Sequence, residues 1–196
     1  MKYEDYLKRF EGILNAAEPQ PPYDEAAYFM FARLNHARMI RWYKTAQLSE
    51  ELVSELQKID APQTWLIIAE PWCGDAAPTV PFLVRLAEQN PLIRHDIQLR
   101  DEEPFVITSY LTNGTKSIPK MVVRDEEGND LFNWGPRPKE AQQFADELKS
   151  SGMSHDNVKA ELQVWYNKDK GTELQKELLP LFASVLRGKA GWMPVI

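Results

Sequence analysis

The chain has 196 residues, of which 43% are hydrophobic, so it can bury a core of ordinary size without disulfide bonds. Its formal net charge is −6 and its basic residues are scattered along the chain, which argues against nucleic acid as a partner. The first ten residues, MKYEDYLKRF, are too charged for a signal peptide, and no apolar run approaches the roughly 18 residues of a membrane-spanning helix. Together with the single cysteine, these features predict a cytoplasmic protein without a membrane partner.

Three helical stretches are expected in the first part of the chain. Their ranges are residues 1–14, 24–44 and 49–59. The second stretch has apolar residues on one face at helical spacing, namely Ala27, Met30, Phe31, Leu34 and Ala37. Pro19, Pro21 and Pro22 end the first stretch, and Pro62 ends the third. We therefore expect residues 1–60 to form an N-terminal helical extension packed on the core.

Strands and helices alternate from residue 61 onward. Thr64–Ala69 is a continuous apolar run, which is typical of a strand buried on both faces of a sheet. The elements expected after it are a turn at 72–75 that leads into a helix to about residue 89, a strand at 93–99, a short helix at 104–111, strands at 120–124 and 131–134, and a helix at 138–149. The last two strands flank a turn that ends in Gly128, so we expect an antiparallel hairpin. This order predicts an α/β fold, with a mixed sheet flanked by helices, over residues 61–150.

Two more helical stretches, residues 157–166 and 172–186, follow the predicted core. We expect residues 151–196 to form a C-terminal helical extension. The last six residues, 191–196, are apolar for a terminus. Two interpretations of them stay open: docking against the chain's own domain, or contact with a partner.

The single cysteine, Cys73, directly follows the first buried strand and stands at the start of a predicted helix. Unpaired backbone N–H groups and the positive end of the helix dipole favour a thiolate at such a place. We therefore expect an accessible thiol, with Trp72 beside it as a flat apolar rim for a partner peptide. The alternative is a small buried residue without a redox role, since free cysteines are often buried. Pro119 precedes a strand, where a proline takes the first strand position or carries a cis bond.

Several of these residues resemble the thioredoxin family. Residues 67–74, IIAEPWCG, are similar to its active-site strand and Trp-Cys-Gly-Pro-Cys turn, and Pro81 matches the proline that kinks its active-site helix. Ser117–Pro119 resembles its cis-proline segment, and Gly135 falls where the family keeps a glycine after the last strand. The resemblance covers about residues 61–150 and implies a thioredoxin-like three-layer fold. The helical extensions resemble those of larger bacterial thioredoxin-like proteins.

The chain departs from the family pattern at three positions. Ala76 stands in place of the second, resolving cysteine, and Asp75 stands in place of the intervening proline. Ile67 occupies the place of the family's buried acid, so the proton acceptor attributed to that acid is missing. Cys73 is therefore expected to form a mixed disulfide that it cannot resolve internally. The Asp75 carboxylate stabilises a helix start but raises the pKa of the neighbouring thiol, and we favour helix stabilisation over a role as catalytic base.

Two functions from different classes are consistent with these residues. The first is monothiol thiol–disulfide exchange with a protein or a low-molecular-weight thiol or disulfide. The second is a redox-inactive, thioredoxin-fold module that binds a peptide or protein. The expected site consists of Cys73 as the catalytic residue, Trp72, Gly74, Ile118 and Pro119 as substrate-binding residues, and Asp75 and Ala76 as modulating residues. No cofactor or metal is expected, because His36, His95 and His155 lie far apart and lack metal-ligand spacing.

Overall fold

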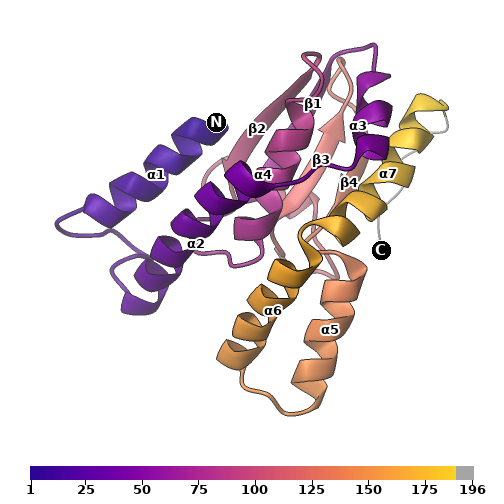
Figure 1. Ribbon diagram of the computed structural model, residues 1–196. Coiled ribbons are helices and arrows are strands. Elements are labelled where there is room, and N and C mark those ends of the chain that lie inside the picture. The colour runs from indigo at the N-terminus through magenta and orange to yellow at the C-terminus, as the bar shows by residue number, and fades with distance from the viewer. Residues whose placement is uncertain (189–196) are drawn as a thin grey trace.

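The computed structural model describes residues 1–188, and strands in this range form one mixed sheet (Figure 1). The strands are β1 (Gln63–Ala69), β2 (Ile93–Leu99), β3 (Lys120–Arg124) and β4 (Asp130–Trp134). Their order in the sheet is β2-β1-β3-β4. β1 runs parallel to β2 and antiparallel to β3, and β3 pairs with β4 as an antiparallel hairpin. The predicted α/β fold with a mixed sheet is confirmed, and its first strand lies inside the sheet.

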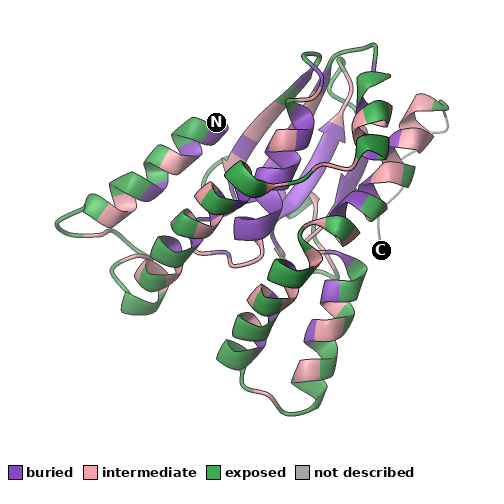
Figure 2. Ribbon diagram, in the orientation of Figure 1, coloured by how far each residue is buried: buried purple, intermediate pink, exposed green. Residues whose placement is uncertain are grey.

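β1 lies inside the sheet because both of its faces are apolar. Leu66, Ile67, Ile68 and Ala69 are at most 2% exposed. The continuous apolar run of the sequence therefore fills both sides of the sheet, as expected of a strand between two neighbours. Figure 2 shows this burial as purple along the central strands.

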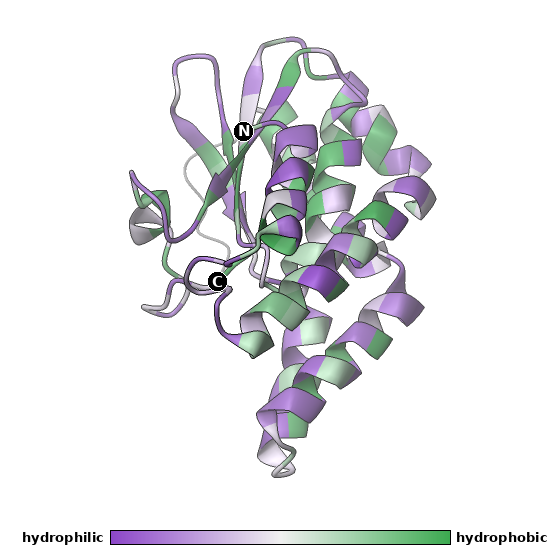
Figure 3. Ribbon diagram, turned by 90° about the vertical axis from the view of Figure 1, so that its left-hand side faces the viewer, coloured by the Kyte–Doolittle hydropathy of each residue, from purple (hydrophilic) through white to green (hydrophobic). Residues whose placement is uncertain are grey.

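Seven α-helices accompany the sheet within residues 1–188. They are α1 (Tyr3–Asn15), α2 (Ala26–Thr45), α3 (Glu50–Gln57), α4 (Ala76–Ala87), α5 (Lys139–Ser150), α6 (His155–Asp169) and α7 (Thr172–Leu186). α4 packs on β1 and β2, α2 packs on α4, and α7 contacts both α3 and β4. In Figure 3 most helices stand on one side of the strands. None of the helices in the described part of the chain is long and apolar enough to cross a membrane.

The turn predicted at 72–75 and the helix after it are confirmed: α4 begins at Ala76, and in the turn the Cys73 N–H donates to the Glu70 carbonyl at 3.0 Å. One expected helix differs from the structure. The helix expected at 104–111 is a short 3₁₀ helix, Val106–Ser109. Phe105, just before it, has a φ of 54°, a left-handed conformation that interrupts α-helical geometry. The apolar segment 191–196 lies outside the described residues.

α5 and α6 form an antiparallel hairpin with a hydrophobic cluster of its own, apart from the main core. The buried members of this cluster are Ala141, Ala145, Val158, Leu162 and Tyr166. In Figure 1 the hairpin projects away from the sheet, with its first and last turns next to the body of the protein. This arrangement places one end of α6 beside the turn that carries Cys73.

Candidate functional site

Cys73 lies in the turn between β1 and α4, and its side chain is buried. It is 5% exposed, so the expectation of an accessible thiol is wrong for this conformation. The sequence suggested exposure because the residue follows a strand end, where turns usually face solvent. Cys73 is instead a member of the main hydrophobic core, together with buried residues of β1 and α4.

The structure brings Cys73 and the predicted cis-proline segment together. The Cys73 Sγ donates a hydrogen bond to the Ile118 carbonyl at 3.4 Å, and the Ile118–Pro119 peptide bond is cis. Gly135 supports this segment from the end of β4: its φ is +116°, and a Cβ there would lie 2.3 Å from the Pro119 carbonyl oxygen. Only glycine fits this approach, which explains its place in the sequence.

The buried environment keeps the Cys73 thiol protonated. Burial raises its pKa from 9.0 to about 12, and the negative charge of Asp75 adds to this effect. Hydrogen bonds from the backbone N–H groups of Ala76 and Asp75, and the positive charge of Arg137, act in the opposite direction. These lowering effects are the ones expected at a helix N-terminus, but desolvation outweighs them.

Asp75 occupies the N-cap position of α4, yet its side chain makes no capping hydrogen bond. Its carboxylate instead accepts a hydrogen bond from the Arg137 guanidinium and one from the Tyr166 hydroxyl, the latter at 2.9 Å. The Arg137 and Asp75 side chains are 17% and 14% exposed, so water screens this ion pair only weakly. The carboxylate expected to stabilise the helix start therefore ties α4 to the residues before α5 and to α6.

Two further side chains hold the turn from opposite ends of the sequence. Asn35, on α2, donates to the Pro71 carbonyl at 2.9 Å and is itself fully buried. Gln163, on α6, donates to the Gly74 carbonyl at 2.9 Å. Both helical extensions thus contribute to the site. Sequence reasoning missed these residues, and a polar residue on an otherwise buried helix face, such as Asn35, is the one available signal.

Trp72 and Ala76 flank the thiol in different ways. Trp72 is half-buried, and its ring meets Tyr28 edge-on, with 5.8 Å between ring centroids. The Arg100 guanidinium also lies over the Trp72 ring, 4.6 Å from its centroid. Ala76, where a resolving cysteine would stand, is fully buried in the first turn of α4. Trp72 therefore has packing partners of its own, and its part in partner binding stays a prediction.

Glu70 is a buried carboxyl close in sequence to Cys73 that the sequence did not single out. It is 5% exposed, and burial raises its pKa to about 7. Its carboxylate accepts the Asp101 N–H, beyond the end of β2, at 2.9 Å. β2 and β3 lie on opposite sides of β1, and Cys73 points to Ile118 before β3. The Glu70 carboxylate therefore hydrogen-bonds on the β2 side of β1, whereas the thiol hydrogen-bonds on the β3 side.

Lys120 is a buried ammonium group next to the cis-proline. It is 2% exposed, and burial lowers its pKa to about 8. Its Nζ donates to the Thr112 hydroxyl at 2.8 Å and to the Gly135 carbonyl at 2.9 Å. These bonds join the segment before β3 to the end of β4, so Lys120 fixes the backbone around Pro119.

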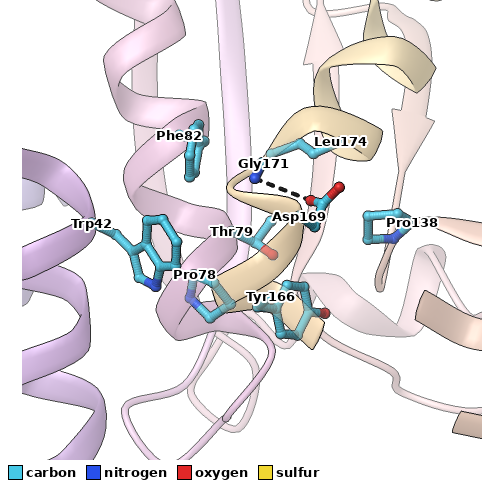
Figure 4. A pocket seen from close by; sticks show the side chains of 9 residues that line it. All are labelled: Trp42, Pro78, Thr79, Phe82, Pro138, Tyr166, Asp169, Gly171 and Leu174. Atoms are coloured by element: carbon cyan, nitrogen blue, oxygen red, sulfur yellow. Dashed lines mark hydrogen bonds between the residues drawn. The ribbon is translucent and has the colours of Figure 1, made fainter. Parts of the chain in front are cut away.

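A small cavity lies behind the site, between α4, α6 and α7 (Figure 4). Its volume is about 10 Å³, close to the minimum for one water molecule. Its lining residues include Phe82, Tyr166 and Gly171. The Gly171 N–H donates to the carboxylate of Asp169, which also lines the cavity, at 3.0 Å. The cavity is too small for a substrate, and Cys73 is not among its lining residues.

A family model described as thioredoxin matches residues 23–149, which includes the sheet, α4 and the Cys73 turn. No curated protein matches the chain significantly. Among solved structures, a protein of unknown function from Pseudomonas aeruginosa is similar over 94% of this chain and 99% of its own, with 17% identity and a TM-score of 0.50.

Two other solved structures are similar to this chain, one over nearly its whole length and one over less than half of it. An HIV epitope scaffold matches over 94% of this chain and 99% of its own, with 20% identity and a TM-score of 0.52. The alkylhydroperoxide reductase protein AhpF from Enterococcus faecalis matches over 45% of this chain and 42% of its own, with 22% identity and a TM-score of 0.38. At such identities the epitope scaffold, like the Pseudomonas protein, supports the fold alone.

Proposed function

Because the chain belongs to the thioredoxin family, we propose that it carries out monothiol thiol–disulfide exchange through Cys73. The observation that carries this proposal is the 3.4 Å contact between the Cys73 Sγ and the Ile118 carbonyl, beside the cis bond to Pro119. A partner chain that pairs with the backbone of Ile118 would bring its disulfide next to the thiol. Ile118 and Pro119 are thus the proposed partner-binding residues, with Trp72 and Gly74 beside them.

The proposed cycle has two exchange steps. The Cys73 thiol loses its proton to solvent, and the thiolate attacks one sulfur of a disulfide, forming a mixed disulfide and releasing the other sulfur as a thiolate. A small external thiol such as glutathione then attacks the bound partner sulfur, which releases Cys73 as a thiolate that takes up a proton. No second cysteine takes part, since Ala76 stands at its position. The cytoplasm, where small thiols are abundant, suits this cycle.

The proposal is tested with a glutathionylated peptide as substrate and reduced glutathione as the resolving thiol. Turnover by the native protein is compared with turnover by Cys73→Ser, which differs by one atom. The expected result is turnover that depends on Cys73 and rises with glutathione concentration. Equal rates for the native protein and Cys73→Ser would overturn the proposal.

The second candidate is a redox-inactive module that binds a peptide or protein. The burial of Cys73 and its raised pKa favour it, because a protonated, covered thiol is a poor nucleophile. In this case the backbone at Ile118 would bind an extended segment without covalent chemistry. The substitution Cys73→Ser distinguishes the two functions. It abolishes thiol–disulfide exchange, but it leaves noncovalent binding of a peptide or protein intact.

A further inference from the structure

We propose that the α5–α6 hairpin is a latch on the Cys73 turn, which keeps the thiol buried while Tyr166 and Gln163 hold Asp75 and Gly74. When the latch opens, Cys73 becomes accessible. The inference rests on the proposed function, since it concerns the regulation of the same thiol. Both the internal packing of the hairpin and its attachments to the body support it.

The hairpin has the features of a unit that can move as one body. Its apolar side chains pack among themselves in a cluster separate from the main core. The chain enters it after Gly135, with φ +116°, and leaves it at Lys170 and Gly171, with φ of 54° and 78°. Opening the hairpin therefore keeps its own cluster buried. A unit with few apolar contacts to the rest of a protein opens at a lower free-energy cost than the unfolding of the whole protein.

The attachments that face the site are polar. From α6, Tyr166 and Gln163 reach the turn, and Asn167 accepts a hydrogen bond from Arg41 of α2 at 2.7 Å. Hydrogen bonds of this kind each contribute only a fraction of the free energy of unfolding, so a few of them can open without unfolding the whole protein. Two of these bonds end on the two residues that follow Cys73, so the latch and the thiol share one turn.

The coupling to thiol chemistry follows from burial. Desolvation is the largest cause of the raised pKa of Cys73, and the charge of Asp75 is the next. Opening of the latch removes cover from the turn and lets water reach both groups. Both changes favour the thiolate, so opening makes Cys73 more accessible and more nucleophilic.

The test uses Tyr166→Phe and Gln163→Leu, which remove the latch hydrogen bonds without changing charge. The readout is the rate at which iodoacetamide alkylates Cys73 in the folded protein, together with the free energy of unfolding. Each variant is expected to raise the alkylation rate about fivefold, and the double variant more than either. The matched control is Tyr43→Phe, which loses a hydroxyl bonded to Glu88 at 2.7 Å, away from the turn.

The outcomes separate the latch from the proposed function, because alkylation requires no disulfide exchange. Unchanged alkylation in both latch variants would overturn the latch. So would a rise in Tyr166→Phe that Tyr43→Phe matches at equal loss of stability, since global unfolding then explains it. Faster alkylation in the latch variants supports the latch, even where exchange with glutathionylated peptide is absent and the proposed function fails.

Discussion

Tyr166 donates a hydrogen bond to Asp75 at 2.9 Å, although 91 positions separate the two residues in the sequence. Through this bond the C-terminal extension reaches the residue that a thioredoxin-type motif places between its two cysteine positions. Arg137 binds the same carboxylate from the segment between β4 and α5. The turn that carries Cys73 is therefore held by two segments that follow it much later in the sequence.

Replacement of Asp75 by asparagine tests this network. Asp75→Asn removes the charge that adds to the raised pKa of Cys73, and it leaves the partly buried Arg137 without its ion-pair partner. We expect several-fold faster alkylation of Cys73 at pH 8, and a free energy of unfolding lower by about 2–3 kcal/mol. Asp146→Asn, at an exposed ion pair with Lys149, is the control and should cost less than about 1 kcal/mol. Equal losses in the two variants would contradict a structural role for Asp75.

Gly135→Ala tests the support of the cis-proline segment. Its Cβ would lie 2.3 Å from the Pro119 carbonyl oxygen, so the segment or β4 has to shift. We expect a loss of about 3–5 kcal/mol in the free energy of unfolding, from steric overlap together with the positive φ. Gly128→Ala, with φ +87° and no atom within 4 Å of the new Cβ, isolates the conformational cost of about 1 kcal/mol. If the two variants are equally stable in urea unfolding, Gly135 does not pack on Pro119 as described.

Lys120→Met tests the buried ammonium group. The pKa of Lys120 is about 8 in the folded protein against 10.5 ordinarily, so between these values the unfolded chain binds a proton that the folded protein has lost. The native protein should therefore gain stability relative to Lys120→Met as the pH rises from 8 to 10, by at most about 1.4 kcal/mol per pH unit. Urea unfolding at several pH values measures this difference. A difference that does not change with pH would contradict the lowered pKa.

Ala76→Cys tests the missing resolving cysteine. The backbone N–H of Ala76 hydrogen-bonds the Cys73 sulfur, so positions 73 and 76 lie close together, and we expect a reversible internal disulfide and measurable reduction of insulin. The native protein should be nearly inactive in the same assay, since its first mixed disulfide has no internal resolving thiol. The gain is expected to be partial, because Ile67 supplies no proton acceptor.

Ala77→Cys, at a neighbouring buried position, is the control for this substitution and should form no internal bridge. Mass spectrometry under oxidising conditions distinguishes the bridge from a mixed disulfide. A bridge in Ala76→Cys without insulin reduction would favour the binding-module candidate. Substantial insulin reduction by the native protein would contradict the monothiol assignment.

The sheet could be predicted closely because its signals are local. β2 and β3 have the predicted bounds, Ile93–Leu99 and Lys120–Arg124, and β1 begins one residue before the expected Thr64. Apolar runs and turn residues near each strand are sufficient for such predictions. The short helix expected at 104–111 is a 3₁₀ helix of four residues, since nothing in the sequence marks Phe105 for the left-handed conformation that precedes it.

The site was predicted less completely, because several of its hydrogen bonds come from distant segments. Cys73 and Ile118 were expected together through the family resemblance, and the structure places them in contact. The contacts of Gln163 and Tyr166 with Gly74 and Asp75 depend on where α6 packs. Helical periodicity predicts that such a helix exists, but it does not specify which surface the helix covers.

The central claim, that Cys73 is a slow but competent monothiol nucleophile, is tested most directly by its reaction with oxidised glutathione. The rate of mixed-disulfide formation on the folded protein is measured by mass spectrometry from pH 7 to pH 10, with Cys73→Ser as the control. Since the pKa of the thiol is about 12, we expect a single glutathione adduct whose rate rises about tenfold per pH unit without a plateau. A plateau near pH 8, or no adduct on the folded protein while the unfolded chain reacts promptly, would contradict the claim.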